Sequence, residues 1–146
     1  LSVLPDQMRF AWDPEDKGVE AGYSAEAFDD AAWRAVATCS ATLNAQGLPD
    51  RKEILWYRAA FEAPRTDRKL ALFFTEVDGM SAKVFLNGRE IAFVEKEMRR
   101  RPFEVDLSPA VRAGRNVLAV RVDHTSITEL SLGGIIRPVL LIEKGD

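Results

Sequence analysis

Apolar and polar residues alternate along much of the chain from Leu55 onward. This is the pattern of β-strands that bury one face and expose the other. In the first such segment, Leu55, Tyr57 and Phe61 fall on one face, whereas Trp56 and Arg58 fall on the opposite face. The segment therefore predicts a strand with a core side and an outer side.

Further strands and a hairpin follow. Residues 69–77 are apolar on both faces, which predicts a central strand that is covered on both sides. The pair Asn87-Gly88 separates two apolar runs and predicts a tight two-residue hairpin, because both turn positions must tolerate a positive φ. Three more strands are predicted, over residues 102–107, 116–123 and 134–143.

The other signals of regular structure are short. Residues 108–114 have the cap, proline and glycine positions of one helical turn. In the less regular N-terminal third, 8–12 and 34–38 are candidate strands, and 24–33 is a loop or a short helical turn. Seven to nine strands without an amphipathic helix predict an all-β fold, an antiparallel two-sheet β-sandwich or jelly roll in one domain over residues 1–146. In such a fold the loops at either end are the natural places for function.

The composition excludes several classes of function. With 146 residues, of which 47% are hydrophobic, the chain suffices for one domain with a real core and is too short for a complete barrel enzyme. Its 20 Lys and Arg residues against 23 Asp and Glu residues give a formal net charge of -3, so no general field attracts nucleic acid. No apolar run approaches the roughly 20 residues of a membrane span. We therefore expect no nucleic-acid partner and no membrane partner.

Motifs that carry chemistry are sparse. Cys39 is the only cysteine and His124 the only histidine, so no internal disulfide and no CxxC pair exists, and a buried small residue is the plain interpretation of Cys39. No phosphate-binding glycine loop or metal-binding motif occurs. A structural cation at Asp13 and Asp16 has no further support, and the mixed-sign run 95–101 is typical of a solvated loop. We expect no catalytic residue, no metal site and no cofactor.

Six segments occur in an order and at a spacing that carry a family resemblance. They are Phe28-Asp-Asp-Ala-Ala-Trp33-Arg34, Trp56-Tyr57-Arg58, Val84-Phe-Leu-Asn87-Gly88, Pro102-Phe-Glu-Val-Asp-Leu107, Gly114-Arg-Asn116-Val-Leu-Ala-Val-Arg-Val-Asp123 and Gly133-Gly-Ile-Ile-Arg137-Pro-Val139. From about residue 28 to its end, the chain resembles the sugar-binding domain of family 2 glycoside hydrolases. That domain is a galactose-binding-domain-like jelly roll, which precedes the later domains of enzymes such as β-galactosidase and β-glucuronidase.

The resemblance implies an accessory domain. Enzymes of this family keep their acid and nucleophile glutamates in a separate barrel of about 250 residues, which is absent here. The chain begins with Leu rather than Met, and we expect it to be a fragment of a longer multidomain glycosidase. The implied partners are the catalytic barrel, the other domains of that enzyme and carbohydrate. By the same resemblance, the periplasm or the cell exterior is favoured as the location.

The resemblance also implies where substrate would be met. In β-galactosidases a loop after the penultimate strand brings a carboxylate to the rim of the substrate pocket, and Asp123, followed by His124, holds the corresponding position. The carboxylate would accept bonds from sugar hydroxyls or hold a cation, and the imidazole would donate a further contact. The alternative is that Asp123 caps a turn and His124 is solvated. Asn44 matches another polar contact of the family, whereas Ile136 stands where the family commonly has an aromatic residue.

Aromatic side chains are the remaining candidates for sugar recognition. Trp56 points away from Tyr57, so it is either exposed on the outer face of the sheet or covered by a neighbouring domain. Trp33 and Tyr57 are expected to be core anchors. Two rival functions stay open, an independent carbohydrate-binding module with exposed aromatic residues and a protein-interaction sandwich without affinity for sugar.

Overall fold

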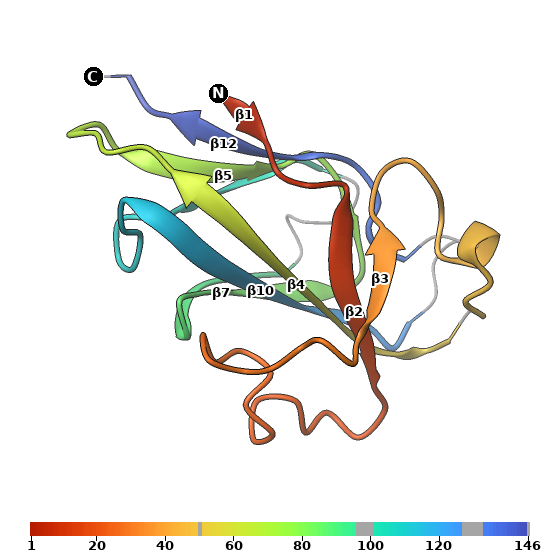
Figure 1. Ribbon diagram of the computed structural model, residues 1–146. Coiled ribbons are helices and arrows are strands. Elements are labelled where there is room, and N and C mark those ends of the chain that lie inside the picture. Colours follow the sequence, from red (N-terminus) through yellow and green to blue (C-terminus); the bar gives the residue numbers. More distant parts are fainter. Residues whose placement is uncertain (50, 96–100, 127–132, 146) are drawn as a thin grey trace.

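The computed structural model describes residues 1–49, 51–95, 101–126 and 133–145 (Figure 1). In chain order the strands are β1 (Ser2–Val3), β2 (Gln7–Asp13), β3 (Arg34–Ala37), β4 (Glu53–Ala63), β5 (Leu70–Phe74), β6 (Val77–Asp78), β7 (Ser81–Leu86), β8 (Arg89–Val94), β9 (Phe103–Asp106), β10 (Gly114–His124), β11 (Gly134–Ile135) and β12 (Val139–Glu143), and a short 3-10 helix, η1, spans Asn44–Gln46. No helix among these residues is long and apolar enough to cross a membrane.

Two antiparallel sheets pack face to face. The larger sheet has the order β3-β2-β4-β10-β7-β8, and the smaller has the order β1-β12-β5-β9. β4 and β10 pair along their whole length, from Glu53 opposite His124 to Ala63 opposite Gly114. The predicted all-β class and antiparallel sandwich are confirmed. Because β4 and β10 are the two long central strands, the residues at their ends mark the two ends of the sandwich.

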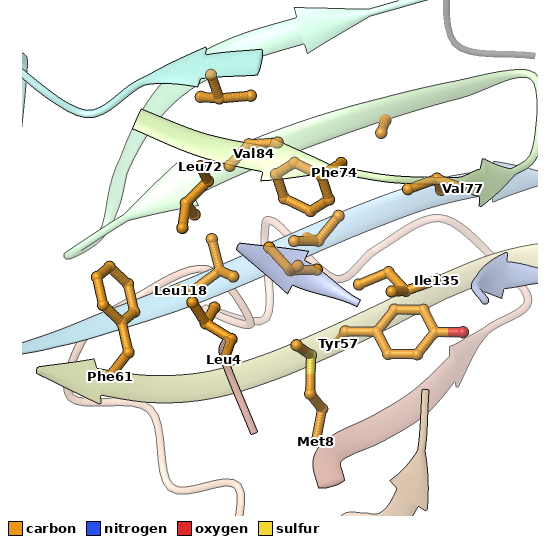
Figure 2. Packing of buried hydrophobic residues seen from close by; sticks show 14 of the residues in the cluster. Leu4, Met8, Tyr57, Phe61, Leu72, Phe74, Val77, Val84, Leu118 and Ile135 are labelled. Carbon is orange, nitrogen blue, oxygen red and sulfur yellow. The ribbon is translucent and has the colours of Figure 1, made fainter. Parts of the chain in front are cut away.

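The main core lies between the two sheets, as the alternation in β4 predicted (Figure 2). Leu55 and Tyr57 of β4 are buried there against residues of the smaller sheet such as Leu72 and Phe74, which are at most 1% exposed. Each such side chain contributes about 1.5–3 kcal/mol relative to an exposed one. The side chains of β4 and β10 that do not point into the main core therefore lie on the outer face of the larger sheet.

The predicted hairpin is confirmed. Asn87 and Gly88 join β7 to β8 with φ values of 51° and 87°. The Asn87 side chain also ties this turn to the turn before β10, since its Nδ2 donates to the carbonyl of Ala110 at 2.9 Å and its Oδ1 accepts from the Val117 amide at 2.8 Å. The helical turn predicted over 108–114 begins as expected, because the Val111 amide donates to the Leu107 carbonyl at 2.9 Å.

Two predicted strands divide in the structure. The strand expected over 69–77 becomes β5 and β6, and the strand expected over 134–143 becomes β11 and β12. Both breaks occur at one place, where Thr75 Oγ1 donates to the Pro138 carbonyl at 2.7 Å and where proline has no N–H for a ladder bond. β6 and β11 then pair with each other as a separate two-stranded sheet. The described residues thus form twelve strands rather than seven to nine.

The N-terminal loop, residues 14–33, covers the outer face of the larger sheet and lies below that sheet in Figure 1. A second, smaller core forms under it from Ile54, Trp56, Phe85 and Ala119, with Tyr23 and Trp33 packed against them. The predicted solvated run 95–101 lies outside the described residues except for its exposed ends. The N-terminal third is therefore an integral part of the domain.

Candidate functional site

The candidate site lies at the end of the sandwich where β10 stops, and we call it the β10 rim: Asp123, His124, β6 and β11. Asp123 is half-buried, and its Oδ1 accepts from the Thr125 amide at 3.0 Å and from the Thr125 hydroxyl at 2.6 Å. No described residue donates to its Oδ2. Asp123 therefore caps a turn through Oδ1, as the alternative interpretation predicted, and Oδ2 has no donor among the residues that the structure describes.

The structure corrects both expectations for His124, a sugar contact and a solvated ring. The side chain is only 5% exposed, and its Nε2 lies 3.3 Å from Asp78 Oδ2. Its Nδ1 lies 3.3 Å from the Arg51 carbonyl oxygen. Both ring nitrogens thus face groups of the protein, because His124 follows Val122 by two positions in β10 and so lies on the same face of the strand as this residue of the main core. His124 therefore links the end of β10 to Asp78 of β6.

Gly134 holds β11 against the core. It has a φ of +68°, and a Cβ built on it would lie 2.0 Å from the Tyr57 hydroxyl oxygen. Figure 2 shows the Tyr57 ring beside Ile135. Burial raises the pKa of Tyr57, partly offset by the Ile135 amide. Only a residue without a side chain permits this approach, so Gly134 is required for the packing of β11 on Tyr57.

A pocket of about 290 Å³ adjoins the two-stranded sheet at this end, and we call it the rim pocket. Its lining residues are Cys39, Ser40, Ala41, Thr42, Glu76, Ile136 and Arg137. The Arg137 Nε lies 3.6 Å from Glu76 Oε2, so the pocket offers an ion pair beside two hydroxyl groups. Such a set of donors and acceptors suits the hydroxyl groups of a sugar ring.

Asp6 fixes the wall of the rim pocket. Its Oδ1 accepts from the amides of Thr38 and Cys39 at 3.0 and 2.7 Å, and its Oδ2 accepts from the Ser40 hydroxyl. The Ser40 hydroxyl, followed by the amides of Cys39 and Ser40, holds the pKa of Asp6 well below its usual range. The same carboxylate raises the pKa of the Cys39 thiol. Cys39 is exposed, which corrects the sequence-based interpretation of this residue as a buried small side chain.

Trp56 offers no face for a sugar, which corrects the sequence-based candidate. Its side chain is fully buried, its Nε1 donates to Asp13 Oδ2 at 2.9 Å, and its ring stacks on Phe85 with centroids 5.6 Å apart. The cover is the chain's own N-terminal loop rather than a neighbouring domain. Asp13 and Asp16 are occupied by protein donors, since Asp16 receives both Nε and Nη2 of Arg121.

Asn44 is exposed at the start of η1, two residues after Thr42 of the rim pocket. It lies on the same loop as that pocket, at the end of the molecule where η1 projects (Figure 1). Sequence reasoning missed Asp78, Glu76 and Arg137. The signal for Glu76 and Asp78 was an acidic pair at the end of an apolar run; Glu76 was included in the strand predicted over 69–77, and Asp78 follows directly after it.

The described residues contain no group of three His, Cys, Asp or Glu side chains that could hold a metal ion.

Comparison with known proteins identifies the family of the chain. The model of the sugar-binding domain of family 2 glycosyl hydrolases matches residues 1–144. The chain belongs to this family. The match begins well before residue 28, so the N-terminal loop is part of the family domain.

Solved structures of β-glucuronidases are similar to the chain. One from an uncultured Clostridium species has 27% identity and a TM-score of 0.77 over 96% of this chain. Those from Lactobacillus rhamnosus and Ruminococcus gnavus have 23% and 22% identity with TM-scores of 0.79 and 0.80 over 97% of it. The chain spans 28% of the length of each of these proteins. No curated protein matches it by sequence.

Proposed function

We propose that this family 2 sugar-binding domain is a non-catalytic accessory domain, which packs on the catalytic barrel of a longer glycosidase and presents the β10 rim to its substrate. The observation that carries the proposal is the match of residues 1–144 to the family, combined with an overlap of only 28% with β-glucuronidases. A domain of this size leaves the two carboxylates of glycoside hydrolysis to the rest of the enzyme. Because the Clostridium relative is a β-glucuronidase, we infer a β-glucuronide as the substrate class.

Asp123 is the residue of the β10 rim that we expect to meet the substrate. Its Oδ1 is committed to Thr125, and this bond fixes the carboxylate so that Oδ2 is presented with little loss of side-chain entropy. His124 and Asp78 are buried beneath it and hold the end of β10 against β6. The rim pocket contributes Ser40 and Thr42 hydroxyls and Asn44 lies on the same loop. Asp123 therefore acts in substrate positioning, not in bond cleavage.

The chain supplies a matched control for Asp123. Asp106 ends β9 with the same chemistry, since its Oδ1 accepts from the Ser108 amide at 2.9 Å and from the Ser108 hydroxyl at 2.6 Å. Replacing either aspartate by asparagine weakens one turn of the same type. The two replacements should therefore differ in their effect on the kinetic constants only if Asp123 belongs to the substrate site.

The test uses the complete enzyme that contains this chain and 4-nitrophenyl β-D-glucuronide as substrate. Asp123→Asn is expected to raise KM about 10-fold with kcat nearly unchanged, which is the effect of losing one hydrogen bond of uniform binding. Asp106→Asn should leave both constants unchanged. Equal behaviour of the two variants would remove the β10 rim from the proposal, and hydrolysis of the glucuronide by the chain alone would contradict its accessory role.

The rival of an independent carbohydrate-binding module loses its main support, because Trp56 is buried under the N-terminal loop. The only aromatic residue that is more than half exposed in the described structure is Phe93, at 51%, and Lys83 Nζ lies 5.6 Å above its ring. A flat stacking platform of several aromatic rings is therefore not available among these residues. A titration of the chain with neutral sugars would reveal such a module by tight binding.

A further inference from the structure

A second groove lies at the opposite end of the sandwich from the β10 rim. It has a volume of about 270 Å³ and is formed where β4 ends, where β5 begins and where the chain turns before β10. We call it the β4–β5 groove; its walls are residues 64–70 together with Ser108, Val111, Arg112 and Ala113. β4 has 11 residues, so the two ends lie roughly 35 Å apart at the usual strand rise. Figure 1 shows the β4–β5 turn at the opposite end of the molecule from η1.

The lining of the groove is strongly basic. Arg65, Arg68, Lys69 and Arg112 line it, against a single carboxylate, Asp67. This excess of positive charge occurs in a chain with a formal net charge of -3. Because like charges held together repel and reduce stability, such a cluster is most stable when an anion occupies it.

Local ion pairs leave much of this charge uncompensated. Arg68 Nη1 lies 3.8 Å from Glu143 Oε2, a long and exposed contact, and Arg112 pairs with Glu26. Among the described residues, no carboxylate lies within 4 Å of the side-chain nitrogens of Arg65 or Lys69, although Lys69 acts on Asp106 at longer range. Two or three cations of the groove are thus available to a ligand.

We propose that the β4–β5 groove binds the carboxylate-bearing ring of an acidic sugar, a uronate residue. A guanidinium binds a carboxylate through two parallel hydrogen bonds, which a chloride or a neutral sugar does not match. The apolar groups of Pro64, Leu70 and Val111 would contact the ring carbons, and the Thr66 hydroxyl would contact ring hydroxyls. The volume is below that of sites for drug-sized ligands, roughly 300–1,000 Å³, and suits a single ring.

This proposal goes beyond the proposed function, because it needs no barrel and uses none of the residues of the β10 rim. It rests on the groove and on membership of a sugar-binding family. The two proposals also fail separately. The β10 rim is tested by KM of the complete enzyme, whereas the groove is tested by ligand contacts of the chain itself.

The test is a titration of the ¹⁵N-labelled chain with sodium D-glucuronate, followed by amide chemical shifts. We expect saturable shifts confined to residues 65–70 and 111–113, with those of Asp123 and His124 unchanged. At equal ionic strength, the affinity for D-glucuronate should exceed that for acetate about 5-fold or more, because acetate lacks the ring contacts. D-Glucose should give no shifts in the groove, because it lacks the carboxylate. Raising the salt concentration should weaken the binding.

The matched variants remove two positive charges each. Arg65→Gln with Lys69→Gln should lower the affinity for D-glucuronate about 10-fold or more. Lys17→Gln with Lys52→Gln changes the net charge equally at exposed positions outside the groove, and it should leave the affinity within about 2-fold. Surface changes of this kind leave the fold intact, within about 0.5 kcal/mol.

Three results would overturn the proposal. Absence of saturable shifts in the groove would show that it does not bind uronate. Equal affinity for acetate and D-glucuronate would show a general attraction of anions without recognition of the sugar. Tighter binding of a glutamate-rich peptide of equal charge would assign the groove to contact with an acidic protein surface.

Discussion

At the scale of single residues, Asp106 and Asp123 show that identical local chemistry can stand in different surroundings. Each carboxylate accepts from the amide and the hydroxyl of a residue two positions later, Ser108 or Thr125. The sequence reveals this Asp-x-Ser/Thr turn directly. It does not reveal that Asp123 stands beside a buried histidine, since the Asp78 partner of His124 is 46 residues away.

Gly134 is a position of the β10 rim at which a side chain does not fit. Gly134→Ala places a Cβ 2.0 Å from the Tyr57 hydroxyl oxygen, at a φ of +68°. We expect a loss of about 2–4 kcal/mol of unfolding free energy from the clash and the backbone strain together. Urea unfolding followed by circular dichroism measures this loss. Gly145→Ala is the matched control, because nothing lies within 4 Å of a Cβ there.

The double variant Gly134→Ala with Tyr57→Phe separates the two causes of that loss. Removal of the hydroxyl relieves the nearest contact but leaves the ring carbons, at 2.7 and 2.8 Å, and the positive φ. The cost of Gly134→Ala should therefore be smaller in the Tyr57→Phe background, yet not zero. Equal costs in both backgrounds would show that β11 moves away from Tyr57 instead of clashing with it.

At the scale of elements, the predictions from the sequence were correct where the contacts that determine an element are close together in the chain. They failed where those contacts join residues far apart in the chain. The Asn87-Gly88 hairpin was predicted correctly because the turn and both strands are adjacent in the chain. The break that separates β5 from β6 was not predicted, because it depends on a bond from Thr75 to Pro138, 63 residues away. The cover over Trp56 was missed for the same reason, since Asp13 lies 43 residues from it.

Arg58 forms the main set of hydrogen bonds that attach the N-terminal loop to the larger sheet. It is 2% exposed, and it donates to the carbonyls of Tyr23, Ala25 and Phe28 at 2.6, 2.9 and 3.3 Å. Its Nε also pairs with Asp30 Oδ2 at 2.9 Å. One buried guanidinium thus satisfies three carbonyls and one carboxylate of the same loop, which the sequence position of a strand arginine does not reveal.

Arg58→Met keeps much of the side-chain volume but leaves these acceptors without their donor. We expect it to reduce the unfolding free energy by about 3–5 kcal/mol, as for removal of one partner of a buried ion pair. Hydrogen exchange of the amides of residues 21–33 should accelerate more than that of β5. Arg115→Met, at an exposed position of the neighbouring strand β10, should change neither quantity appreciably.

At the scale of the whole molecule, the two ends of the sandwich differ in chemistry. The β10 rim combines Asp123, a buried His124–Asp78 pair and a pocket with hydroxyl groups, whereas the β4–β5 groove is basic. β4 and β10 run between the two ends and pair along their whole length. The sequence analysis predicted that function lies at the loops of the sandwich. It did not predict that basic residues of the β4–β5 turn and of the turn before β10 meet at one end. That convergence depends on the turn before β10 lying against the β4–β5 turn.

The two cores should unfold together, because they are the two faces of the same pair of strands. Tyr57 of the main core and Trp56 of the second core are neighbours in β4, and their burial requires the same backbone. Trp12 packs on the main core, so a Trp12→Phe chain leaves Trp33 and Trp56 as reporters of the second core alone. In that chain we expect urea transitions by tryptophan fluorescence and by far-ultraviolet circular dichroism to coincide. Adding Arg58→Met should separate them, with fluorescence changing at lower urea concentration, because the N-terminal loop then detaches before the sheets unfold. Separate transitions in the chain that retains Arg58 would contradict this coupling.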